Sequence, residues 1–199
     1  DNSLDSGTAQ KTGEVLQNQS EGDTIEEKTT AKAVPDADKS RTVAYTNDNE
    51  KVDLVFRVVS VDDLVVSNGL DGKVNPDYPQ TLQPRDRSRT SSQSQIRQIA
   101  ANLNTARLAE STSVSEGSPI VGFDNVVESG NGRTLAIKLA YENGTADEYR
   151  NYIISNADKY GLDVSKIPEK PVLVRERITE VDRREFTRKA NESSIGSLS

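Results

Sequence analysis

The residues best suited to chemistry lie in one stretch, Ser129-Gly130-Asn131-Gly132-Arg133-Thr134. Two β-branched residues before it, Val126 and Val127, favour a strand that ends at Glu128. A helix-compatible run follows from Thr134. A strand, a glycine turn and a helix start aim several backbone N–H groups and a helix dipole at one spot, which suits a phosphate. Arg133 can fork onto phosphate oxygens. An ordinary strand-to-helix turn explains the same glycines equally well.

Three carboxylates near this stretch in the chain or in the expected fold could support catalysis: Glu128, Asp86 and Glu176. With Glu128 as the first candidate, they would serve a Mg²⁺-dependent nuclease or NTPase. The alternative is that they pair with neighbouring arginines, and it is favoured, because ion pairs are commoner than catalytic carboxylates.

The composition narrows the chemistry further. The chain has no His and no Cys, which excludes a thiolate nucleophile, a Ser-His-Asp triad and a Cys/His zinc site. No zinc and no haem are therefore expected, and a metal would be a hard cation such as Mg²⁺. The net charge of −7 argues against a nonspecific DNA clamp, although arginines are frequent after residue 48. The absence of Met suggests either a segment cut from a longer protein or a processed product.

The chain is expected to divide into two parts. Residues 1–48 are acidic and polar and predict a disordered linker, whereas residues 49–199 predict a mixed α/β domain with a small mixed sheet and surrounding helices. No apolar run long enough for a membrane helix and no signal peptide are present, so a cytoplasmic protein without a membrane partner is expected. The expected strands are 51–61, 119–123, 126–128 and 171–177, and the expected helices are 92–108, 134–142, 145–161 and 180–193.

Local signals mark the ends of these helices. Ser92 with Gln95, Thr145 and Thr179 are the expected caps, and Asn143-Gly144 is the expected stop of the second helix. The first helix should carry one apolar stripe, formed by Ile96, Ile99, Ala100 and Leu103. Before it, Arg85, Arg87 and Arg89 alternate along a strip that either is a solvated loop or faces phosphate.

The order of short motifs resembles the N-terminal domain of the ParB family, within the ParB/sulfiredoxin superfamily. Leu82-Gln83-Pro84-Arg85 is similar to the family's "NPxQPR" box, and Ser118-Pro119-Ile120-Val121 to its "QPIVV" strand. The run from Gly130 to Ala140 aligns without a gap on "GERRxRAAKLA". Later in the chain, Pro171–Val174 is similar to the "IPVIV" strand and Ala190–Ser193 takes the place of "ENIQR". Within this superfamily, the sequences of these motifs are most similar to the DdrB-like ParB domains of phage and mobile-element antirestriction proteins of the DarB type.

This resemblance implies a site. Partition-type ParB domains bind CTP with Mg²⁺ through the GERR loop, and Gly130, Arg133 and Ala136 match that loop here. Asn131, Gly132 and Leu135 depart from it. In the last box Asn191 matches, with Glu192 beside it, so these two residues are the candidate metal ligands. The sulfiredoxin branch needs a cysteine in the loop, which this chain lacks.

The expected function is a nucleotide or nucleic-acid phosphate-binding module of a larger phage or mobile-element protein. It would work beside helicase or methyltransferase modules in a bacterial host and would be packaged in the virion in some cases. The phosphate would lie at residues 129–134, with help from four further side chains: Gln83, Arg85, Arg87 and Arg175. Two alternatives remain open here, the Mg²⁺-dependent enzyme and a scaffold domain that has lost its site.

Overall fold

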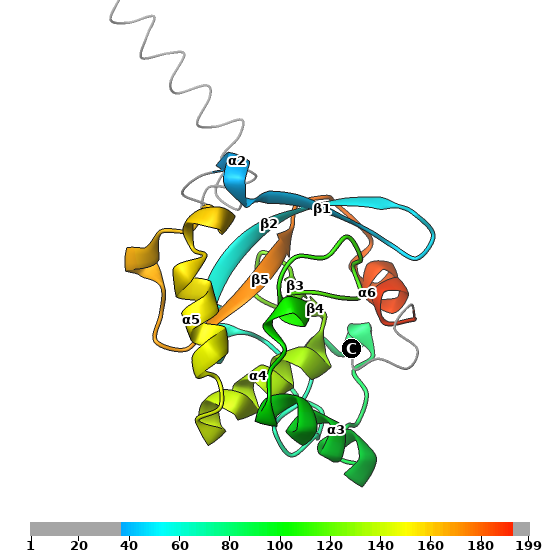
Figure 1. Ribbon diagram of the computed structural model, residues 1–199. Helices are drawn as coiled ribbons and strands as arrows, with labels where there is room; N and C mark the ends of the chain where they lie inside the picture. The colour runs from blue at the N-terminus through cyan, green and yellow to red at the C-terminus, as the bar shows by residue number, and fades with distance from the viewer. Residues whose placement is uncertain (1–36, 193–199) are drawn as a thin grey trace, which may run out of the picture. The chain divides into compact units, whose positions relative to one another are not determined.

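The computed structural model describes residues 37–192 (Figure 1). The expected linker over residues 1–36 and the end of the last predicted helix, after residue 192, lie outside the described residues. Within the described part, no helix is long and apolar enough to cross a membrane.

The centre of the fold is a five-stranded mixed sheet in the order β1-β2-β5-β3-β4. Its strands are β1 (Arg41–Tyr45), β2 (Lys51–Ser60), β3 (Ile120–Val121), β4 (Val127–Ser129) and β5 (Pro171–Arg177). Neighbouring strands are antiparallel except β3 and β5, which run parallel. The mixed sheet of the predicted fold class is confirmed, and the valine-rich runs predicted as strands form β2 and β5.

Helices surround this sheet (Figure 1). They are α2 (Ala37–Ser40), α3 (Thr90–Ala101), α4 (Asn131–Asn143), α5 (Asp147–Ser155) and α6 (Arg183–Glu192). Short 3₁₀ turns connect them: η1 (Val61–Asp63), η2 (Gln80–Leu82), η3 (Thr105–Leu108), η4 (Asp158–Tyr160) and η5 (Val164–Lys166). The mixed α/β class is therefore confirmed.

Two apolar clusters lie on opposite faces of the sheet. Adjacent residues of a strand point to opposite faces, and Val121 belongs to the larger cluster while Ile120 belongs to the smaller one. The larger cluster includes apolar residues of α3, α4 and α5, among them Ile96 of the predicted apolar stripe. The smaller cluster is closed by Phe186 and Ala190 of α6. The last helix, α6, thus contributes apolar side chains to the core of the domain in addition to its arginines.

The predicted linker ends too late in the chain. Residues 37–48, expected to be disordered, include α2 and β1, and Ala44 of β1 is fully buried. The short segment has little local signal because its stability comes from pairing with β2 and from two hydrogen bonds between Tyr45 and the distant residues Thr112 and Val114. Strand propensity depends on such partners more than on the segment itself.

Several predicted helix starts are wrong, and at two of them the hydroxyl expected to cap the helix bonds elsewhere. Helix α3 begins at Thr90 without a side-chain cap, so the expected pair of Ser92 and Gln95 is not its start. The Thr145 hydroxyl donates to the Ala100 carbonyl, and the Thr179 hydroxyl accepts the Asp53 N–H. A tertiary partner competes successfully with the local helix for a small hydroxyl.

The expected helix over 92–108 breaks after Ala101 and resumes as the 3₁₀ turn η3. The Asn104 side chain accepts the Ala106 N–H and so begins this turn. By contrast, the stop predicted at Gly144 is confirmed, because this glycine ends α4 in the left-handed conformation.

The boundary of the domain can be tested by truncation. A chain that starts at Asn49 lacks β1 and exposes the part of the smaller cluster around Val52 and Leu54, whereas a chain that starts at Ala37 keeps it. We expect the shorter chain to lose about 3 kcal/mol of stability, or roughly 6–12 °C in melting temperature. Equal melting temperatures for the two chains would show that β1 contributes nothing to the fold.

Candidate functional site

The glycine stretch is more helical than its sequence indicates. Gly130, with φ of 94°, is the left-handed cap of α4, and the helix already begins at Asn131. The N–H and the hydroxyl of Thr134 both donate to the Gly130 carbonyl, at 2.9 and 2.7 Å. Because a residue with positive φ turns the chain directly from strand to helix, no separate loop is needed. The predicted loop residues Asn131, Gly132 and Arg133 therefore form the first turn of the helix.

Arg133 folds back over this turn and is only 9% exposed. A Cβ atom on Gly130 would lie 2.6 Å from Arg133 Nη2, so the glycine makes room for the guanidinium. Nη1 donates to the Ser115 carbonyl and Nη2 lies 3.5 Å from the Ser129 hydroxyl, while Nε has no hydrogen-bond partner among the described residues. Burial lowers the pKa of Arg133 to about 10. In the part of the chain that the structure describes, no carboxylate bonds to this buried guanidinium.

Arg175 is a second buried guanidinium, fully covered on β5. It donates to backbone carbonyls of the segment 111–118, including those of Ser111 at 3.0 Å and Ser118 at 2.9 Å. Burial, and then repulsion by Arg133, lower the pKa of Arg175 to about 9. The structure places this predicted phosphate ligand where it holds the segment 111–118 to the sheet, with its guanidinium occupied by carbonyl oxygens.

Two other predicted ligands also have structural partners. The Ser129 hydroxyl donates to the Val114 carbonyl at 2.6 Å. The Asn131 side chain accepts the Ser67 N–H at 2.8 Å and donates to the Tyr78 hydroxyl at 3.3 Å. Both are buried, so they shape the turn rather than present polar groups to a ligand.

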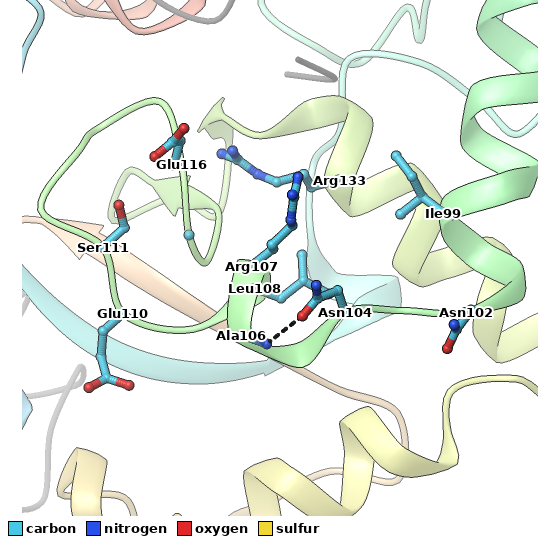
Figure 2. A pocket seen from close by; sticks show the side chains of 11 residues that line it. Ile99, Asn102, Asn104, Ala106, Arg107, Leu108, Glu110, Ser111, Glu116 and Arg133 are labelled. Carbon is cyan, nitrogen blue, oxygen red and sulfur yellow. Dashed lines mark hydrogen bonds between the residues drawn. The ribbon is translucent and has the colours of Figure 1, made fainter.

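Beside Arg133 the structure has a pocket of about 460 Å³ (Figure 2). Ile99 of α3 and Leu108 of η3 give it apolar surface. Arg107 rises from η3 into it and Arg133 reaches across from α4 toward the segment that carries Glu116 (Figure 2). Among the described residues, Arg107 makes no side-chain hydrogen bond or ion pair. The pocket therefore combines apolar walls with two guanidinium groups.

The three candidate catalytic carboxylates do not converge on this pocket. Glu128 is fully buried, accepts two bonds from Arg177 at 2.8 and 2.9 Å, and accepts a third from Arg183 at 2.6 Å. Glu176 pairs with Arg57 at 2.8 Å. These contacts match the structural alternative, in which the carboxylates serve as ion-pair partners.

Asp86 is exposed, and hydrogen bonds from Ser88 lower the pKa of its carboxyl. Within residues 37–192, no group of three Asp, Glu, His or Cys side chains could hold a metal ion. A divalent cation would therefore need oxygen ligands from a bound molecule, such as phosphate oxygens.

The remaining predicted residues assemble at a different place. Gln83 and Arg85, which follow η2, and Asn191 of α6 line a second pocket of about 490 Å³ together with Arg184 and Arg188. Residues more than a hundred positions apart thus meet as the resemblance between boxes implies, but none of the residues given as lining their pocket also lines the Arg133 pocket. The side chain of Glu192 lies outside the described residues.

Arg87, the other predicted arginine of the strip, is buried. Burial, followed by repulsion from Arg85, lowers the pKa of Arg87 to about 10. Its neighbour Arg85 is exposed, so the alternating arginines of this strip face different surroundings.

Sequence reasoning missed the pocket residues before the glycine stretch, above all Arg107, Asn102 and Asn104. They were missed because the helix expected over 92–108 runs through all three of them without a break. Two asparagines at the helix end are the signal that could have shown the break, since Asn favours caps and turns. It also missed Arg183 as a partner of Glu128.

The comparison with protein families agrees with this architecture. A family model described as the ddrB-like ParB superfamily domain matches residues 47–178. The chain belongs to this family. No curated protein and no solved structure matches the chain. The family match ends before α6, so the arginines of that helix lie beyond it.

The role of Glu128 can be tested against that of Asp86. Glu128→Gln leaves the guanidinium groups of Arg177 and Arg183 without their shared carboxylate, and we expect a loss of about 3 kcal/mol. This corresponds to a fall of roughly 6–12 °C in melting temperature. Asp86→Asn, the matched change at an exposed carboxylate, should stay within about 0.5 kcal/mol of the parent chain. Equal stability of the two variants would remove the structural role of Glu128.

Proposed function

We propose that this ParB-like domain binds a nucleotide through its phosphates in the pocket between Arg107 and Arg133. The observation that carries the proposal is the buried charge of Arg133. A charge removed from water is costly unless a partner of opposite sign compensates it. No carboxylate of the described residues bonds to Arg133, although the exposed Glu116 raises its pKa at longer range. An anion in the adjoining pocket would supply the missing compensation.

The shape and lining of the pocket support a nucleotide as that anion. Its volume of about 460 Å³ lies in the range of pockets that take small molecules. Ile99 and Leu108 offer apolar contact for a base or sugar, while Arg107 and Arg133 offer N–H donors for phosphate oxygens. The polar and apolar parts of the pocket thus correspond to the two parts of a nucleotide.

A nucleoside triphosphate would enter with Mg²⁺ in this proposal. Mg²⁺ is usually held by one or two carboxylates together with phosphate oxygens and water. Glu116 lines the pocket and offers one such carboxylate, whereas Asn191 lines the other pocket. The residues present therefore fit a metal that is bound mainly by the nucleotide itself. Bound Mg²⁺ would neutralise phosphate charge, while Arg107 and Arg133 orient the phosphate group.

The wider role follows from the family and remains part of the proposal. We infer that the domain is one module of a larger phage or mobile-element protein that acts in DNA transactions or antirestriction in the bacterial cytoplasm. Helicase or methyltransferase modules are the proposed neighbours. Glu128 bonds to two arginines and lies outside the nucleotide pocket, so binding is better supported than Mg²⁺-dependent hydrolysis.

Arg107 gives the cleanest test, because Arg133 is also needed for the fold. Arg133→Ala would leave the Ser115 carbonyl without its donor and open a gap over Gly130, so lost binding and lost stability could not be separated. Arg107→Ala removes an exposed guanidinium and should leave the melting temperature of the free protein unchanged. We expect it to weaken nucleotide binding by about 1.5 kcal/mol, or roughly tenfold.

The measurement is a thermal-shift panel of nucleoside mono-, di- and triphosphates with and without Mg²⁺, followed by titration calorimetry with the best ligand. A ligand that binds only the folded state raises the melting temperature. Arg97→Ala, the same change at an exposed arginine of α3, should keep the parent affinity. If no nucleotide shifts the melting temperature, or if both variants lose affinity equally, the pocket is not a nucleotide site.

A further inference from the structure

The nucleotide pocket has a polar side chain at the end that belongs to α3. Asn102 directly follows α3, which ends at Ala101, and its side chain lines the pocket. Figure 2 shows Asn102 apart from the guanidinium groups of Arg107 and Arg133. The residue is exposed, and within residues 37–192 its carboxamide makes no hydrogen bond. In the described part of the chain, the pocket thus offers a carboxamide without a protein partner, separate from its two guanidinium groups.

The neighbouring asparagine has a structural role that Asn102 lacks. Asparagine near a helix end usually bonds to nearby backbone groups. Asn104 does so, because its Oδ1 accepts the Ala106 N–H at 3.1 Å and begins η3. Asn102 leaves the helix with φ of −151° and donates its backbone N–H to the Ile99 carbonyl at 3.3 Å. Its side chain caps no backbone group of residues 37–192, so the local fold does not explain the carboxamide.

The end of α3 holds Asn102 in a fixed place. Ile96 and Ala100 of this helix are buried in the larger apolar cluster. The Thr145 hydroxyl also donates to the Ala100 carbonyl at 2.7 Å, so the last turn of α3 is bonded to the chain after α4. A side chain that extends from an anchored turn loses less freedom on binding than one on a loose segment does. Asn102 is therefore presented to the pocket from a preorganised position.

The apolar part of the same pocket offers a surface for a planar base. Ile99, on the last turn of α3, and Leu108, on η3, both line the pocket. A base that lies against these side chains removes apolar surface from water. Ile99 precedes Asn102 by only three residues, and its carbonyl accepts the Asn102 N–H. A base that contacts Ile99 can therefore bring its edge near the carboxamide.

The chemistry of the carboxamide matches the edge of a base. An Asn side chain has an acceptor oxygen beside an N–H donor. The pairing edge of each nucleobase also presents donors and acceptors side by side, and proteins recognise bases through hydrogen bonds to this edge. A phosphate carries negative charge and accepts hydrogen bonds, so the guanidinium groups of Arg107 and Arg133 match it better. The two kinds of polar group thus divide the pocket between the base and the phosphates.

We propose that Asn102 determines the specificity of the pocket by hydrogen bonding to the base of the nucleotide. This inference rests on the proposed function and narrows its ligands to compounds that carry a nucleobase. Inorganic triphosphate and sugar phosphates would contact Arg107 and Arg133 but would lack the hydrogen bonds to Asn102 and the contact with Ile99. They should therefore bind more weakly than a nucleotide does.

The test changes the hydrogen-bonding character of residue 102 and follows the choice of base. Asn102→Asp replaces a donor and an acceptor by two acceptors. Guanine presents two neighbouring N–H donors on its pairing edge and suits a carboxylate, whereas adenine presents an acceptor beside its amino group and does not. We expect the ratio of the dissociation constant of ATP to that of GTP to rise about tenfold over the parent chain. Titration calorimetry with ATP, GTP, CTP, UTP and inorganic triphosphate, each with Mg²⁺, measures the affinities.

Asn104→Asp is the matched control. It places the same charge in the same pocket and keeps an acceptor for the Ala106 N–H, so the ratio of the two dissociation constants should stay at the parent value. Both free variants should keep the parent melting temperature, because residues 102 and 104 are exposed.

Three results would overturn the role of Asn102. They are an unchanged ratio in Asn102→Asp, an equal shift of the ratio in Asn104→Asp, and inorganic triphosphate that binds to the parent chain as tightly as the best of the four nucleotides. In each case, nucleotide binding that Arg107→Ala weakens would still support the proposed function. The absence of any nucleotide binding would refute the proposed function and this inference together.

Discussion

Two buried guanidinium groups hold the centre of this domain, and within residues 37–192 neither bonds to a carboxylate. Arg175 of β5 donates hydrogen bonds to backbone carbonyls of the segment 111–118. Arg133 of α4 donates a hydrogen bond to the Ser115 carbonyl of the same segment. A carbonyl oxygen satisfies an N–H donor but does not neutralise a positive charge. The segment is thus held by two buried cations to which no carboxylate of the described residues bonds, although Glu116 raises the pKa of Arg133 at longer range. Its other contacts, to Tyr45 of β1 and to Ala190 of α6, connect this place to both ends of the domain.

The arrangement also explains why the buried glutamate and the buried arginines do not pair with each other. Glu128 faces the other partners, Arg177 and Arg183, and with them it fastens α6 to the sheet. The carboxylate of Glu128 has a structural role in these ion pairs. The charged guanidinium of Arg133 lies beside the pocket and is not bonded to that carboxylate. A shared ion pair between Glu128 and Arg133 would compensate the charge of Arg133 and would leave no reason to propose an anion beside it. The anion site that we propose at this strand-to-helix junction depends on the separation of the two charges.

The sequence predicted those parts of the fold that have a local cause. Valine-rich β2 and β5, the apolar stripe with Ile96 on α3 and the stop at Gly144 follow from periodicity and turn chemistry. Strand β1, the true helix starts and the pocket around Arg107 depend on partners far away in the chain, so no local pattern reveals them. The strand-to-helix turn lies in the glycine stretch, as the sequence predicts, but the sequence does not show what the side chains of this stretch contact. The same Arg133 that resembles a surface phosphate ligand is buried, and only the folded chain shows which neighbours it lacks.

The central claim is that a nucleotide compensates the charge of Arg133 and thereby steadies the segment 111–118. Hydrogen–deuterium exchange, with and without a saturating nucleotide and Mg²⁺, tests it most directly, because it reads local opening residue range by residue range. The account predicts slower exchange in 111–118 and in the first turn of α4, with little change in the exposed part of the β1–β2 hairpin. Unchanged exchange in both segments under conditions where the nucleotide binds would contradict it.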